Sequence, residues 1–358
     1  MRALPPIYPW SAFESRRWTE AGRLPIVARD PPGDRFTLHC QSEEMRHRLT
    51  SEFDRVSFER VGVLRGEFAV LPEGLLLVDR AGAYVSVNFP NEASVVGQMP
   101  FESANRRELW DEVQLIRDNW DALPLIENGA VFSHIYYNNY YHFCFELLQK
   151  FRLIEPLGVK TVVIPPLIYG GRVYRELIVQ ALGDRVVVPA DRLVRLRNPV
   201  IAQAYQSDEG LRWLRKLVGK TVPSGGKRYY VRRTPKQIRR GNNIAESETF
   251  LNFLRKHDFI TIDFGNGELS VEEQLNKLEG ASLILAPHGA GLTNLAHLSA
   301  PLRVIEVFGR AVISTSFIRI SEALGFEHHA IISEQLDAQE NIVVDLGLLE
   351  RLVDRPVG

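Results

Sequence analysis

The sequence predicts an α/β fold with two parallel-sheet domains facing across a cleft. Its 358 residues are enough for two domains of ordinary size. After residue 227, short apolar segments alternate with helical segments, which is typical of βα units joined by right-handed crossovers. Weaker alternation of the same kind precedes residues 217–226, whose glycine, proline and serine predict a linker between the domains.

The composition excludes several classes of protein. Hydrophobic residues make up 45% and charged residues 24% of the chain, which is typical of a soluble globular protein. A net charge of −1 argues against a general nucleic-acid binder. Cys40 and Cys144 leave one disulfide open but do not indicate a secreted scaffold. Because neither a signal-peptide core nor a membrane-spanning apolar run is found, we expect a cytoplasmic protein, with peripheral membrane contact left open.

The first half is predicted to be β-rich at its start and α/β afterwards. Residues 66–89 contain apolar runs separated by Pro-Glu-Gly and Arg-Ala-Gly turns, which predict hairpins in an N-terminal extension over residues 1–100. An α/β domain over residues 101–220 follows. Its predicted elements are helices at 103–119, 141–154 and 173–182 and strands at 131–136, 161–164 and 186–188.

The second α/β domain is predicted over residues 221–335. Asn243 and Glu246 have the spacing of a capping box that begins a helix, as do Ser270 and Glu273. The remaining predicted elements are strands at 228–231, 259–262, 283–286 and 304–307, a helix at 317–324 and a C-terminal tail at 336–358.

Residues 281–308 predict a strand, a glycine loop, a short helix and a second strand. Two glycines in the loop let the backbone turn sharply and approach a ligand. The helix that follows offers unpaired N–H groups and a positive dipole end to an anion. A histidine would add positive charge, and a carboxylate lies where the second strand ends. The expected nucleotide-diphosphate pocket contains His288, Gly289, Ala290, Gly291, Thr293, Asn294 and Glu306.

Other interpretations of this loop stay open. A Gly-x-Gly loop after a strand is common in α/β domains, and it often contacts no phosphate. In a Rossmann dinucleotide loop a third glycine would stand where this chain has Asn294, and that loop usually lies early in the chain. The pattern therefore argues against a dehydrogenase. Glu306 is alternatively a structural acid.

A run of basic residues lies between positions 227 and 240, and no acidic residue interrupts it. Arg232 and Arg233 fall where a predicted strand ends, on the edge where the glycine loop should also emerge. The planar guanidinium of arginine suits phosphate oxygens. The run therefore favours a small polyanionic ligand, and its alternative is a solvated basic face.

A second cluster, at residues 136–146, combines tyrosines, asparagines, a histidine and a glutamate. His142 and Glu146 are four residues apart and share a helical face. A carboxylate beside a histidine orients it for general base catalysis. The alternatives are a purely structural pair or a metal site, for which a third ligand is not evident. Cys144 lies off this face and is expected to be a small buried residue.

The chain contains no Asp-x-Asp motif, with which many sugar-nucleotide enzymes hold Mg²⁺ or Mn²⁺. Together with the basic run, this favours arginines and a helix N-terminus as the groups that stabilise a diphosphate. We therefore expect no metal and no cofactor.

These motifs resemble those of glycosyltransferase family 61. That family includes eukaryotic O-linked N-acetylglucosaminyltransferases, plant xylan pentosyltransferases and bacterial proteins of capsular polysaccharide biosynthesis. The resemblance spans roughly residues 130–330. It rests on the segment HGAGLTN at 288–294 with Val304-Ile305-Glu306, on YYVRR at 229–233 with Arg239-Arg240, on Glu273-Gln274, and on YYHF at 140–143 with Glu146.

The resemblance implies a GT-B-like fold and an inverting, metal-independent transfer. It assigns the acceptor to the first domain, with its N-terminal extension, and the nucleotide sugar to the second. The residue that deprotonates the acceptor is left open, and the chemistry of the side chains favours His142 or Glu146. The donor-binding residues that it implies are Arg232, Arg233, Arg239, the loop at 288–294, and Glu306 at the ribose edge.

We therefore expect a glycosyltransferase of polysaccharide biosynthesis, whose partners are a nucleotide-sugar donor and a glycan or lipid-linked acceptor. One alternative is a nucleotide-sugar-binding module without transfer activity, which would need no base at His142. Another is a GT-B-like nucleotide-sugar epimerase, which would convert the donor without an acceptor.

Overall fold

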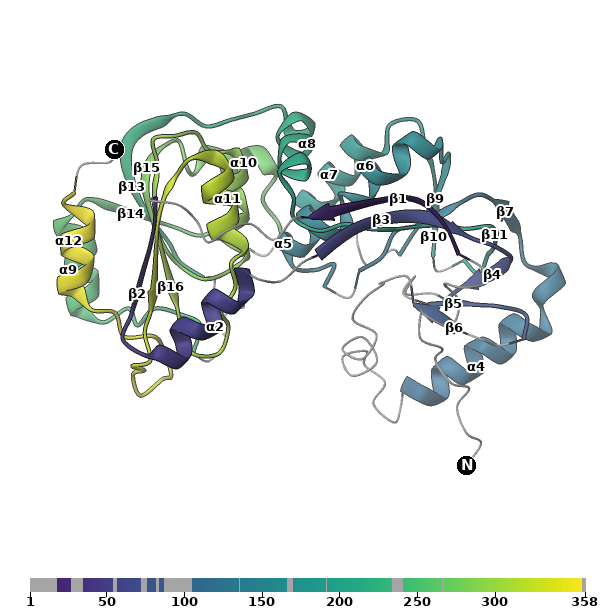
Figure 1. Cartoon of the computed structure of the whole chain (residues 1–358), viewed down its shortest axis with the longest axis horizontal. Coiled ribbons are helices and arrows are strands. Elements are labelled where there is room, and N and C mark those ends of the chain that lie inside the picture. Colours follow the sequence, from purple (N-terminus) through teal and green to yellow (C-terminus); the bar gives the residue numbers. More distant parts are fainter. Residues whose placement is uncertain are drawn as a thin grey trace. The chain divides into compact units, whose positions relative to one another are not determined.

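The structure, a computed structural model, describes residues 18–26, 35–53, 57–71, 76–81, 84–86, 105–134, 136–165, 170–190, 192–233, 241–265 and 267–355. Contacts between residues divide the chain into two compact units (Figure 1). The described residues of unit 1 lie within 18–26, 57–170 and 177–210, and those of unit 2 within 35–53, 171–176 and 211–355.

Unit 2 is built on a six-stranded sheet in which every neighbouring pair is parallel, as the pattern of the second half predicted. The central strands are buried almost throughout, because both faces of the sheet are covered. In sheet order the strands are β14 (Phe259–Ile262), β13 (Ser224–Val231), β15 (Gly280–Pro287), β16 (Arg303–Phe308), β17 (Glu327–Ile332) and β2 (Phe36–Cys40).

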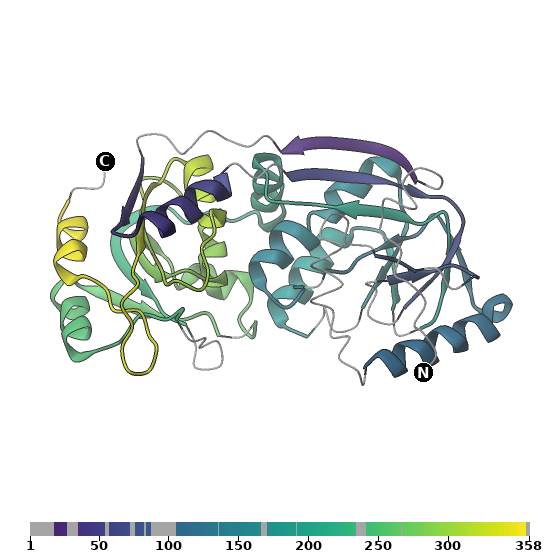
Figure 2. The same cartoon turned by 60° about the horizontal axis from the view of Figure 1, so that its bottom comes forward.

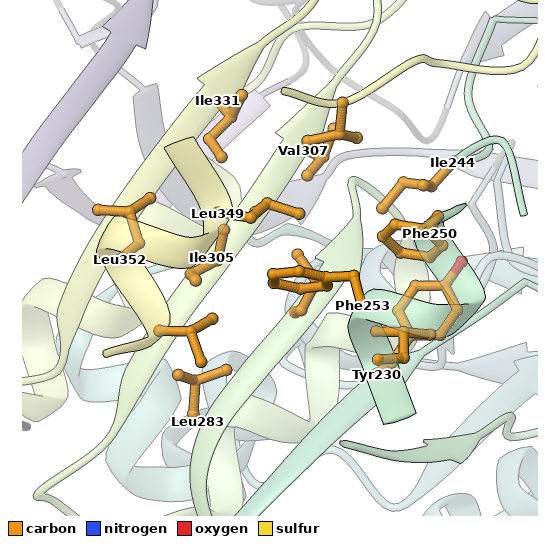
Figure 3. Packing of buried hydrophobic residues seen from close by; sticks show 14 of the residues in the cluster. Tyr230, Ile244, Phe250, Phe253, Leu283, Ile305, Val307, Ile331, Leu349 and Leu352 are labelled. Carbon is orange, nitrogen blue, oxygen red and sulfur yellow. The ribbon is translucent and has the colours of Figure 1, made fainter. Parts of the chain in front are cut away.

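One face of this sheet is covered by helices α9 (Glu248–Lys256) and α12 (Leu346–Val353). They bury Phe250 and Leu349 against strand residues such as Ile305 (Figure 3). The C-terminal segment is therefore part of the core, whereas the sequence predicted a tail. An eight-residue helix at the end of a chain gives a weak sequence signal, because its stability comes from this packing.

The other face is covered by helices α2 (Glu43–Phe53) and α11 (Ser316–Leu324), which bury Leu49 and Ile318 in a second cluster. Strand β2 precedes α2 and pairs with β17, and both views show these N-terminal elements beside the strands of unit 2 (Figures 1 and 2). Residues 35–53 thus belong to unit 2, although the prediction assigned them to the first domain. A five-residue strand carries no information about which sheet it will join.

The helix starts in unit 2 agree only in part with the predicted capping boxes. The box formed by Ser270 and Glu273 is confirmed at the start of α10 (Val271–Asn276). Helix α9, however, is capped by Ser247, whose side chain accepts from the N–H of Phe250. Asn243 does not begin a helix, because the residue after it, Ile244, forms a parallel bridge to Ile342.

Unit 1 contains two sheets, and neither is wholly parallel, whereas the sequence predicted a parallel sheet. In the first sheet, antiparallel pairs at one edge adjoin parallel pairs at the other. The second confirms the predicted hairpins, because strands that follow one another in the sequence are antiparallel neighbours. The strands of the first are β1 (Trp18–Ile26), β3 (Ser57–Leu64), β12 (Val200–Gln203), β8 (Ala130–Val131), β9 (Thr161–Ile164) and β10 (Val186–Pro189), and those of the second β6 (Tyr84–Ser86), β5 (Leu76–Val78), β4 (Glu67–Val70), β11 (Arg195–Arg197) and β7 (Leu125–Glu127).

Two of the points at which the chain passes between the units lie within helices α7 (Arg172–Leu182) and α8 (Asp208–Val218). The last passage follows residue 210, about a turn into α8, so it precedes the predicted linker at 217–226. No helix in the described part of the chain is long and apolar enough to cross a membrane. The remaining helical elements are α4 (Asn105–Asp118), η1 (Trp120–Ala122), α5 (Tyr140–His142), η2 (Phe143–Leu147), α6 (Lys150–Ile154), η3 (Glu155–Leu157) and η6 (Ala290–His297).

Candidate functional site

The glycine loop of unit 2 connects β15 to the 3₁₀ helix η6, as the sequence predicted. Gly289 and Gly291 are needed for close packing rather than for a left-handed backbone. A Cβ atom on Gly289 would lie 2.8 Å from the Nη2 atom of Arg233, and one on Gly291 would lie 3.1 Å from the ring of Phe264. The guanidinium of Arg233 also donates to the carbonyl oxygen of His288. A fixed positive charge therefore lies directly against the loop.

The other arginines expected at this site are placed differently. The side chain of Arg232 is 41% exposed, and its Nη1 atom lies 3.7 Å from the Glu246 carboxylate. The two neighbours thus differ, since consecutive residues at a strand end face opposite ways. Arg239 lies outside the described residues, so the structure places only part of the predicted basic run.

Thr293 and Asn294 do not present side chains to a ligand, contrary to the expectation. Both are buried in η6. The Asn294 amide donates to the side-chain oxygen of Gln274 at 3.0 Å and so ties η6 to helix α10. These residues support the loop from inside, and the residues left at its surface are His288, Gly289, Ala290 and Gly291.

Glu306 lies in β16 and is fully buried, with both carboxylate oxygens held by histidines. Its Oε1 atom lies 2.6 Å from Nδ1 of His288, and its Oε2 atom lies 3.1 Å from Nε2 of His328. Behind them, the hydroxyl of Ser321 lies 2.8 Å from Nδ1 of His328. Burial alone would raise the pKa of Glu306, but hydrogen bonds from the two histidines outweigh it and lower that pKa.

This geometry corrects the expected role of Glu306. A carboxylate that is 0% exposed and accepts from two imidazoles has no free edge for the hydroxyls of a ribose. Its position instead fixes the ring of His288 at the start of the loop. The sequence singled out Glu306 but did not show that its side chain points into the interior. Its two histidine partners are 18 and 22 positions away in the sequence.

In unit 1, the aromatic segment begins with a short α-helix and continues as a π-helical turn, η2. The predicted helix at 141–154 is therefore interrupted, and π-turns are common at functional sites. His142 and Glu146 face each other as expected, with 2.8 Å between Nδ1 and Oε2. The same carboxylate oxygen lies 2.8 Å from Nε2 of His134, which follows strand β8.

Charge in this cluster is concentrated on Glu146. Burial tends to raise the pKa of Glu146, but hydrogen bonds from His134 and His142 dominate and lower it to about 2. Burial lowers the pKa of Lys150 to about 7, although the charge of Glu146 opposes that shift. Glu146 is thus an anion that orients histidines and a weak base itself. Burial raises the pKa of the Cys144 thiol, which agrees with its expected role as a buried side chain.

The ring of His142 is enclosed on several sides but keeps one polar atom available. His134 stacks on it with 5.6 Å between ring centroids, and the ring of Tyr136 lies 4.8 Å away. Its Nδ1 atom is engaged by Glu146, and 27% of its side chain is exposed. This arrangement presents Nε2 of His142 as an oriented acid–base group.

His134 supplies the third ligand of a potential metal site, which the sequence alone did not reveal. The ligand atoms of His134, His142 and Glu146 lie within 4.8 Å of one another. However, Nδ1 of His134 accepts from the backbone N–H of Tyr136 at 3.1 Å, so its Nε2 atom carries the proton and donates to Glu146. A metal-bound histidine instead donates from its other nitrogen. The hydrogen bonding fits a histidine–carboxylate cluster better than a metal centre.

Four residues of these clusters were missed from the sequence. His134 is separated from His142 by a loop and therefore has no helical spacing to reveal it. Lys150 falls on the apolar face of its helix. His328 and Ser321 lie on β17 and α11, and the doublet at 328–329 was the one signal that a polar pair enters an apolar strand.

Part of this sequence is similar to known proteins. Residues 140–305 match the model of the family described as Glycosyltransferase 61. A β-1,2-xylosyltransferase, RCN11, from Oryza sativa subsp. japonica is 33% identical over 63 residues, which is 18% of this chain and 12% of the rice protein. The matched segment includes His142, Glu146, Arg233 and His288. Residues 140–305 of this chain are therefore similar to the glycosyltransferase 61 family.

Proposed function

We propose that the protein is a glycosyltransferase that transfers a sugar from a nucleotide-sugar donor to a hydroxyl group of a glycan or glycoconjugate. The observation that carries this proposal is the family match over residues 140–305. The matched segment contains the partly exposed histidine of each cluster, His142 and His288. The xylosyltransferase similarity supports the same class of reaction.

We assign the donor to unit 2, in a GT-B-like division of labour. The diphosphate would lie against the glycine loop, where Gly289 leaves room for the guanidinium of Arg233, which supplies a fixed positive charge. Arg232 is exposed and would make a weaker, screened contact. Parallel α/β sheets bind ligands at the carboxyl ends of their strands, which is where this loop lies.

Unit 1 would bind the acceptor and deprotonate its hydroxyl group. Nε2 of His142 takes the proton, while Glu146 holds Nδ1 and stabilises the imidazolium that forms. Direct displacement of the diphosphate by this activated oxygen inverts the anomeric centre. Aromatic rings and amides of the same segment suit the apolar faces and hydroxyls of a sugar.

The transfer is proposed to need no metal. The sequence lacks Asp-x-Asp, and the hydrogen-bond acceptor at Nδ1 of His134 disfavours metal binding at the three-residue cluster. The polysaccharide context and a lipid-linked acceptor are proposed on the earlier resemblance alone, and a cytoplasmic location is proposed on the sequence features described first.

A panel of nucleotide sugars tests this function, first by thermal shift and then by product analysis with and without EDTA. A true donor should raise Tm and, with an acceptor, yield a product of inverted anomeric configuration by NMR. Turnover that survives EDTA supports metal independence, whereas loss restored by Mn²⁺ would assign His134, His142 and Glu146 as ligands. Donor binding without product would indicate a binding module, and conversion without acceptor an epimerase.

The His142→Ala variant tests the base. We expect kcat to fall by roughly 10²-fold or more, the usual scale of general base catalysis, with nucleotide affinity unchanged. Tyr136→Phe is the matched control, because it keeps the ring that packs on His142. A loss of donor binding in His142→Ala would contradict the assignment.

A further inference from the structure

His288, Glu306, His328 and Ser321 form a chain of hydrogen bonds inside unit 2, which we call the histidine–glutamate chain. It crosses unit 2 from the loop through β16 and β17 to helix α11. Glu306, His328 and Ser321 are each at most 1% exposed, and His288 alone reaches the surface, with 16% of its side chain exposed. The chain therefore leads from the interior to the glycine loop.

The ring of His288 is held so that one nitrogen remains for a ligand. Phe308 stacks on it with 4.9 Å between centroids, and Phe317 lies at 5.3 Å on a tilted plane. Nδ1 is engaged by Glu306 at 2.6 Å. Because a neutral His288 donates from Nδ1, its Nε2 atom becomes a donor when the ring gains a second proton.

Negative charge beside His288 favours a second proton on its ring when a diphosphate binds. Glu306 already places a negative charge in the interior, where His328 lies between its carboxylate and the hydroxyl of Ser321. An incoming dianion adds negative charge beside the loop, and nearby negative charge favours the protonated imidazole. Among the described residues, the Arg233 guanidinium contacts the backbone of His288, and its positive charge opposes proton uptake there.

We infer that unit 2 binds a diphosphate together with a proton, which the imidazole of His288 carries and donates from Nε2 to a phosphate oxygen. Glu306, His328 and Ser321 are the positioning residues for this step. The inference rests on the proposed donor site and adds a proton-linked anion site to it. No bond to carbon forms or breaks, since the proton comes from the solvent and returns there when the diphosphate leaves.

Calorimetric titration of the full chain with UDP, GDP and pyrophosphate tests this coupling. Measurements at one pH in buffers of different ionisation enthalpy give the number of protons taken up. We expect net uptake for the wild type and an affinity that weakens as pH rises. In Glu306→Gln, affinity should fall by about tenfold to a hundredfold, the range for charged hydrogen bonds, and proton uptake should shrink.

Two further variants separate positioning from folding. Ser321→Ala removes the hydroxyl that ends this chain of hydrogen bonds and leaves the charge of the protein unchanged. It should reduce proton uptake less than Glu306→Gln does. His329→Gln is the matched control, because His329 is a buried neighbour on β17 that bonds to Glu327 instead. It should leave proton uptake unchanged.

The outcomes distinguish this inference from the proposed function. If neither the nucleotides nor pyrophosphate bind, the donor site itself fails. If they bind without proton uptake, or if uptake persists in Glu306→Gln and His288→Gln, the proton linkage is wrong while the glycosyltransferase proposal stands. If Glu306→Gln loses affinity but takes up the same number of protons as the wild type, the four hydrogen-bonded residues have only a structural role.

Discussion

Each unit contains a glutamate bridged by two histidines, Glu146 in unit 1 and Glu306 in unit 2. In both, the carboxylate is buried or nearly so, and its pKa is lowered because its hydrogen bonds outweigh the cost of burial. One histidine of each pair, His142 and His288, keeps a partly exposed ring. At the scale of single residues, both units thus use a buried carboxylate to orient the imidazole of a partly exposed histidine.

The two neighbouring arginines should contribute unequally to diphosphate binding. Arg233→Ala should weaken binding of UDP or pyrophosphate by about 1.5–3 kcal/mol, the range for hydrogen bonds to charged groups. Arg232→Ala should cost less, because its side chain is 41% exposed and lies near Glu246. Isothermal titration of both variants checks this order, and equal losses would contradict the placement of Arg233 against the loop.

At the scale of elements, strand β2 is held to the edge of the unit 2 sheet by backbone pairing and by a polar side-chain contact. Nε2 of His39 lies 3.2 Å from Nδ1 of His329, whose Nε2 bonds to Glu327. Burial, and then the charges of His329, Arg355 and Arg351, lower the pKa of His39 to about 4. The native state therefore favours neutral His39, which links the docking of this N-terminal strand to pH.

The stability of unit 2 should fall as the pH is lowered. Because the pKa of His39 is lowered on folding, its contribution is fully present above its unfolded value of 6.5 and is lost as pH falls toward about 4. His39→Gln should flatten this dependence, whereas His47→Gln, exposed on helix α2, should not. Urea unfolding across this pH range measures the free energy of unfolding of both variants. If it depends on pH as steeply in His39→Gln as in the wild type, His39 does not link stability to pH.

At the scale of the whole molecule, unit 2 is assembled from three parts of the chain, while its sheet remains wholly parallel. Strand β2 closes one edge, and the C-terminal helix α12 covers one face with Leu349 and Leu352 (Figure 3). Segments far apart in the sequence therefore belong to the unit that contains the glycine loop. The loop follows β15, which packs Leu283 and Leu285 into the same cluster as helix α12.

Shortening a buried side chain of helix α12 should accordingly destabilise unit 2. Leu349 is 0% exposed, so Leu349→Ala should lower the free energy of unfolding by about 2–5 kcal/mol through lost burial and a residual cavity. Leu348→Ala, next to it and only partly buried, should cost less. Chemical denaturation compares the two, and a loss at Leu349 no larger than at Leu348 would argue that α12 is a peripheral tail after all.

The sequence determined the local features whose signals span few residues. The strand–loop–helix order around Gly289, the capping box at Ser270 and the contact between His142 and Glu146 were all predicted, because each depends on spacings within one turn or one βα unit. The tertiary structure decided the rest. Which sheet β2 joins, why α12 is core, and which histidines reach Glu146 and Glu306 depend on packing between distant segments, about which local periodicity carries no information.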